Sequence, residues 1–105
     1  MSQPELFDVI ELLVDLPGSG LQVGDRGAIV EQYGDRAYEV EFTHEGGETR
    51  ALVVLSPEQL MVVWRSATED WVPLTERIMA MARVLPEERQ AEVLSFARSL
   101  YRASV

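Results

Sequence analysis

The sequence predicts an α+β protein, with a small antiparallel barrel of five strands followed by a C-terminal helical hairpin or elbow. Two observations predict this class. Between residues 24 and 64 apolar residues alternate with polar ones, which is the period of a strand. After residue 74 they recur every three or four positions, which is the period of a helix. We therefore expect a β domain over residues 1–64, a linker over 65–73 and a helical segment over 74–103.

The strongest strand signal is the run YEVEF, in which Tyr38, Val40 and Phe42 alternate with two glutamates. Because successive side chains of a strand point to opposite faces, we expect these three residues inside and the glutamates outside. GAIVEQY precedes this run across the turn signal Gly34-Asp35, and TRALVVL follows it after a looser turn. Together the three runs predict an antiparallel meander.

The segment SPEQ ends the meander and predicts one helical turn. Ser56 can cap such a turn, Pro57 suits its first position, and Gln59 stands where a capping-box partner belongs. A short strand, LMVVW, is the natural continuation.

The first segment, FDVIELLVDLPGSGL, is ambiguous when it is taken from its residues alone. Leu6, Val9, Ile10 and Leu13 fit one face of a helix, whereas the β-branched content and the PGSG stop fit a strand that enters a loop. A strand here would help to cover an edge of the meander.

The last thirty residues predict two helices. In PEERQAEVLSFARSLYR the apolar residues fill one side and the charged residues fill the other, with glutamates at the start and arginines at the end. LTERIMAMARVL gives an earlier apolar stripe, and the break falls at Leu85-Pro86.

The charge balance and composition exclude several classes of function. The chain has eighteen acidic residues, nine arginines, no lysine and no cysteine. Residues 1–65 hold twelve acids and four arginines, a net charge of −8, so we expect the barrel to repel a phosphate backbone. Disulfides and thiolate chemistry are excluded. No apolar run is long enough for a membrane span, and the N-terminus lacks a signal-peptide pattern, so we expect a cytoplasmic protein.

Residues able to do chemistry are sparse. His44, the one histidine, falls in the turn THEGGE, where we expect solvent exposure. Glu39 and Glu41 share a strand face and could in principle bind a metal, but a solvated surface is the simpler interpretation. The glycine-rich stretch GSGLQVGDRG does not open a helix, so it predicts no phosphate site. We expect no catalytic residue, no metal and no cofactor.

The apolar helix stripe has to be covered, because an isolated helix of this length is marginal in water. It can pack on its own barrel, on a second copy or on another protein. The two tryptophans beside the linker either fill the barrel–helix junction or anchor a partner. The candidate residues for partner binding or self-association are Trp64, Trp71, Ile78, Met81, Val93, Phe96, Leu100 and Tyr101.

Four motifs follow one another along residues 5–64: Asp15-Leu16-Pro17, the run Gly27 to Glu31, YEVEF and LVVLSPEQLMVV. In this order they resemble the bacterial domain of unknown function 4926, although Ala28 stands where the pattern prefers threonine. The resemblance implies a small Src-homology-3-like barrel and makes the first segment a strand. Residues 74–102, with LPEERQAEVLSF, are similar to the domain of unknown function 2281, which implies an antitoxin-like component of a toxin–antitoxin pair.

These observations favour a non-catalytic protein-binding module, antitoxin-like, that binds a partner such as a basic toxin or an enzyme subunit and forms a homo-oligomer. Two alternatives stay open. The first is a nucleic-acid reader, for which Arg26, Arg36, Arg50 and Arg65 would have to cluster on one face. The second is an accessory domain that packs on a larger enzyme.

Overall fold

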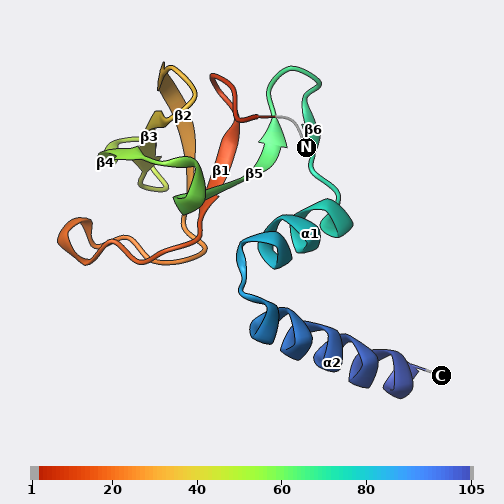
Figure 1. Cartoon of the computed structure of the whole chain (residues 1–105). Helices are drawn as coiled ribbons and strands as arrows, with labels where there is room; N and C mark the ends of the chain where they lie inside the picture. Colours follow the sequence, from red (N-terminus) through yellow and green to blue (C-terminus); the bar gives the residue numbers. More distant parts are fainter. Residues whose placement is uncertain (1–2, 105) are drawn as a thin grey trace. The chain divides into compact units, whose positions relative to one another are not determined.

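The computed structural model describes residues 3–104, and the chain divides into two compact units (Figure 1). The first, called here the β unit, ends at Pro73, and the second, the helical unit, begins at Leu74. Strands make up the β unit and α-helices the helical unit. The predicted α+β class is confirmed.

In the described part of the chain, the strands form one antiparallel sheet in the order β4-β3-β2-β1-β5-β6. The end strands β4 and β6 each pair with a single neighbour, so the sheet is barrel-like but not closed (Figure 1). This agrees with the expected Src-homology-3-like barrel, except that the sheet has six strands where five were expected. The ambiguous first segment contains a strand, β1. The strands are β1 Val9–Leu12, β2 Arg26–Tyr33, β3 Ala37–Thr43, β4 Thr49–Leu55, β5 Leu60–Arg65 and β6 Asp70–Trp71.

The core of the β unit lies on the inner face of this sheet. The alternation in β3 is as predicted, because Tyr38, Val40 and Phe42 are buried while Glu39 and Glu41 stay partly exposed. The same alternation places residues of β1, β2, β4 and β5 in this core, and Leu21 contributes from the loop between β1 and β2. The buried cluster consists of Ile10, Leu12, Leu21, Ile29, Tyr38, Val40, Phe42, Leu55 and Leu60.

Gly27, in the signature GAIVE, is required by the close approach of β2 to β3. A Cβ atom at this position would lie 2.7 Å from Val40 Cγ1 and 2.8 Å from the backbone oxygen of Glu41. Real Cβ atoms do not come that close to backbone oxygens, so any larger residue would push the two strands apart.

The segment SPEQ folds as its sequence predicts. Residues Pro57–Gln59 form one 3-10 turn, η2, which joins β4 to β5. The Gln59 Oε1 atom accepts hydrogen bonds from the backbone N of Ser56 at 2.9 Å and from its Oγ at 3.3 Å. The capping-box prediction is confirmed.

Residues 65–73, predicted to be a linker, instead complete the sheet. β6 pairs with β5 through Trp64↔Trp71 and Arg65↔Asp70, and the backbone N of Val72 donates to the oxygen of Val63 at 2.9 Å. Val72 is buried. The boundary therefore falls after Pro73, because a strand of two residues leaves no periodic pattern and is held by its pairing alone.

The helical unit consists of α1, Leu74–Val84, and α2, Glu87–Ser104, with the break at Leu85-Pro86 as predicted. Proline has no backbone N–H and cannot continue α1. Across the break, Gln90 Nε2 donates to the backbone oxygen of Ala82 at 2.7 Å. Neither described helix is long and apolar enough to cross a membrane.

Candidate protein-binding site

The helix α2 exposes the apolar residues that the sequence predicts for partner binding. Val93, Phe96, Leu100 and Tyr101, called here the α2 face, are between 39 % and 65 % exposed. No residue of α2 is buried. Their spacing of three, four and one positions places them on one side of the helix, so they form a continuous apolar strip.

The helix α1 also presents its apolar residues to solvent. Ile78 is 58 % exposed and Met81 is 37 % exposed. Leu74 and Met79 are more than half exposed, and no residue of α1 is buried. The helical unit therefore exposes its apolar side chains and has no buried core of its own.

Charges along α2 change sign from its start to its end. Glu87 and Glu88 stand in the first turn and Arg102 in the last. At these positions each charge interacts favourably with the helix dipole. An exposed ion pair joins Arg89 to Glu92 at 2.7 Å, but a surface pair of this kind contributes little to stability. The helix α2 thus has an acidic end and a basic end.

The two predicted tryptophans belong to the β unit and are brought together by strand pairing. Trp64 on β5 lies opposite Trp71 on β6, and Trp64 is partly buried. Trp71 stays 58 % exposed, and the Arg26 guanidinium carbon lies 5.4 Å from its ring centre. This distance is within the range of a cation–π interaction, so one side of Trp71 is engaged by its own chain.

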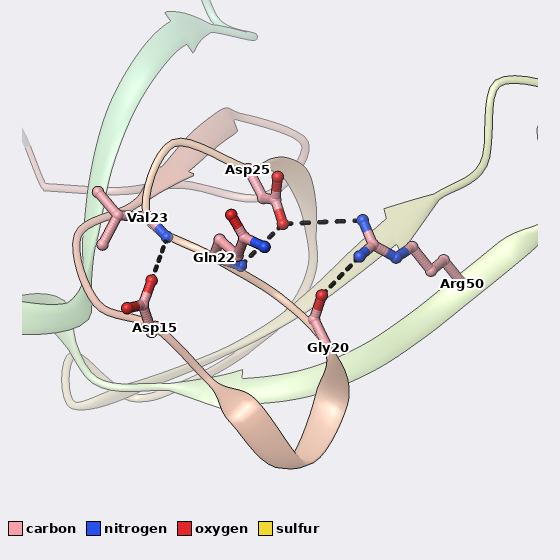
Figure 2. A network of polar contacts seen from close by, with 6 residues as sticks. All are labelled: Asp15, Gly20, Gln22, Val23, Asp25 and Arg50. Carbon is pink, nitrogen blue, oxygen red and sulfur yellow. Dashed lines mark hydrogen bonds and ion pairs between the residues drawn. The ribbon is translucent and has the colours of Figure 1, made fainter.

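A polar network that the sequence did not predict fixes the long loop between β1 and β2 (Figure 2). Asp15 Oδ1 accepts from the backbone N of Val23, and Asp25 Oδ2 accepts from that of Gln22, both at 2.9 Å. Arg50 on β4 donates to the backbone oxygen of Gly20 at 2.6 Å and lies 3.7 Å from Asp25. Asp15, the aspartate of the Asp-Leu-Pro signature, therefore has a structural role. Its position just before a glycine-rich loop is the sequence signal that could have predicted this role.

Asp8 is a second residue that sequence reasoning missed. Its carboxylate is only 2 % exposed and accepts from the backbone N of Glu5 at 3.0 Å and from that of Ser66 at 2.8 Å. It thus joins the N-terminal turn to the β5–β6 connection. A carboxylate inside the apolar run FDVI is the sequence signal that could have found it.

The described residues 3–104 contain no group of three or more His, Asp or Glu side chains that could hold a metal ion. His44 lies exposed in the turn between β3 and β4, as predicted. Glu39 accepts from Tyr33 and Glu41 from Thr49, so both carboxylates have partners on the surface. The side chains that stand out among the described residues are the exposed apolar ones of α1 and α2.

Comparison with known proteins gives a match to one family model. No curated protein and no solved structure matches the chain. A family model described as Domain of unknown function (DUF4926) matches residues 6–62, from the N-terminal turn into β5. This match does not extend to the helical unit, so its similarity to the domain of unknown function 2281 stays a prediction. With more than half of its length matched, the chain belongs to the family of the Domain of unknown function (DUF4926).

Proposed function

We propose that this protein is a non-catalytic protein-binding module that associates through its helical unit. The observation that carries the proposal is that α1 and α2 have no buried residue, although both carry large apolar side chains. Covering a side chain such as Phe96 contributes about 1.5–3 kcal/mol. Several such residues on one face are sufficient to drive association.

The occupant of the α2 face is a second copy of the chain, and the module is a homodimer. The charge distribution supports this choice. In an antiparallel pair, the start of one α2, with Glu87 and Glu88, lies near the end of the other, with Arg102. A two-fold pairing of this kind sets opposite charges and opposite helix dipoles side by side.

The partner of the dimer is a basic protein, in keeping with an antitoxin-like role in the cytoplasm. The β unit holds fourteen acidic residues and four arginines, a net charge of −10, whereas the helical unit holds four acids and five arginines, a net charge of +1. A surface of this charge steers cationic partners toward it. A nucleic-acid reader has less support, since Arg26 contacts Trp71 and Arg50 contacts Gly20 and Asp25.

Light scattering on the full chain tests the proposal. We expect a mass twice the 11.8 kDa of one chain, and a monomer for the double variant Phe96→Ala and Leu100→Ala. The matched control is Val23→Ala, which removes a similarly exposed apolar side chain from the β unit and should stay dimeric. A wild-type monomer whose α2 amides exchange freely would contradict the proposal.

A further inference from the structure

The strand β4 is an open edge of the sheet. It pairs with β3 alone, and in the described part of the chain no backbone hydrogen bond joins its other side to another segment. Its seven residues, Thr49–Leu55, contain no proline. An edge with unpaired N–H and C=O groups is a template on which a further strand can form.

The half of β4 that ends in Leu55 lacks the usual protection of an edge. Natural edge strands carry charged residues, prolines or bulges that prevent pairing with other chains. The one charged residue of β4 is Arg50, which contacts Gly20 and Asp25, and the bulge in the β3–β4 pairing lies at the same end. Beyond it, Leu52 and Val54 point outward and are 55 % and 54 % exposed.

Carboxylates border these two apolar side chains. Leu52 pairs with Glu41 and Val54 with Glu39 on the same outer face of the sheet. Tyr33 is half exposed and donates to Glu39 Oε1 at 3.3 Å. We call these five residues, Tyr33, Glu39, Glu41, Leu52 and Val54, the β4 face.

We propose that β4 binds an extended segment of a partner protein as an additional strand, and that this segment alternates arginine or lysine with apolar residues. Neighbouring strands lie about 4.8 Å apart, so a long basic side chain on the outer face can cross Leu52 or Val54. Its aliphatic stem would cover the apolar side chain while its charged end reaches Glu39 or Glu41. The alternate residues would lie beside Ala51 and Val53, which are partly buried against the core.

Charge decides between this partner and a second copy. Two β4 edges paired together would bring two β units of net charge −10 into contact, with their glutamates near one another. A basic segment neutralises the same carboxylates. This site is separate from the α2 face and does not depend on it.

The test is a titration of ¹⁵N-labelled full-length Phe96→Ala, Leu100→Ala protein, in which the α2 face is removed. The probe is a blocked peptide of alternating arginine and valine, and the control peptide has serine in place of valine. We expect the valine peptide to shift and protect the amides of β4, and the serine peptide to bind about tenfold more weakly. Equal binding of both peptides, or shifts spread over the whole β unit, would overturn the proposal.

A pair of matched variants separates this site from general attraction to an acidic protein. Glu39→Gln with Glu41→Gln should weaken valine-peptide binding about tenfold, because both carboxylates border β4. Glu45→Gln with Glu48→Gln makes the same charge change in the β3–β4 turn and should leave binding nearly unchanged. Equal losses in the two pairs would contradict the site. Concentration-dependent protection of β4 without peptide would assign the edge to a second copy instead.

Discussion

The two units of this chain contain similar amphipathic patterns but use them differently. In the β unit, alternation turns Tyr38, Val40 and Phe42 inward, and they are almost fully buried. In the helical unit, Phe96 and Leu100 follow an equally regular helical period and stay exposed. A periodic pattern therefore says which face of an element will be covered, but it does not say whether the same chain covers it.

The same substitution in the two units is the sharpest test of this difference. Phe42→Ala should lower the free energy of unfolding of the β unit by about 3–5 kcal/mol, because it opens a cavity in a packed core. Phe96→Ala should change it by less than about 0.5 kcal/mol, since this ring is 65 % exposed. Urea unfolding followed by tryptophan fluorescence measures the β unit alone, because Trp64 and Trp71 both lie in it.

An equal effect of the two substitutions would break the comparison. It would mean that α2 packs on the β unit in solution and that the α2 face contributes to one common core. Fluorescence at several protein concentrations adds a control, because an effect of Phe96→Ala that grows with concentration reports association rather than folding.

Asp8 allows a smaller test within the β unit. Asp8→Ala should cost about 1–3 kcal/mol, because the backbone N–H groups of Glu5 and Ser66 would lose the buried carboxylate that accepts from them. We expect amide exchange to accelerate mainly in the N-terminal turn and in the β5–β6 connection. Asp15→Ala is the matched control, since Asp15 accepts one hydrogen bond at an exposed position and its loss should cost less. Equal costs for both would contradict a special role for Asp8.

Local patterns were sufficient to predict much of the β unit and the break between the two helices. The alternation in β3, the capping box at Ser56 and the helix break at Pro86 each depend on residues within a few positions, and each is confirmed. In these segments the neighbours along the chain are also the neighbours in space. The glycine of the GAIVE signature is explained only by the structure, because its contacts come from β3.

The features that were missed depend on residues far apart in the sequence. Asp8 accepts a hydrogen bond from Ser66, and Arg50 donates one to Gly20. The partners in each pair lie far apart in the sequence, so no local pattern predicts that they meet. β6 is held by Trp64↔Trp71 pairing and is too short to show a period. For the candidate site, helical periodicity placed the residues of the α2 face on one side of the helix, and their role in association stays a prediction. The open edge of β4 could not be predicted, because it follows from the order of strands in the sheet.

The smallest expected effect concerns Tyr33 on the outer face of the β unit. Desolvation raises the pKa of Tyr33, and the charge and hydrogen bond of Glu39 raise it further, with a smaller contribution from Glu31. Because the pKa of Tyr33 is higher in the folded than in the unfolded state, its protonated hydroxyl stabilises the folded state. This stabilisation is complete below the ordinary pKa of tyrosine and is lost as the pH rises through the raised pKa. Glu39→Gln should lower the Tyr33 pKa toward the ordinary value, as followed by the NMR shift of its ring carbon. The alkaline loss of stability would then become smaller, whereas Glu45→Gln should leave both unchanged. An unchanged Tyr33 pKa in Glu39→Gln would mean that the two side chains do not interact in solution, and the β4 face would lose one of its contacts.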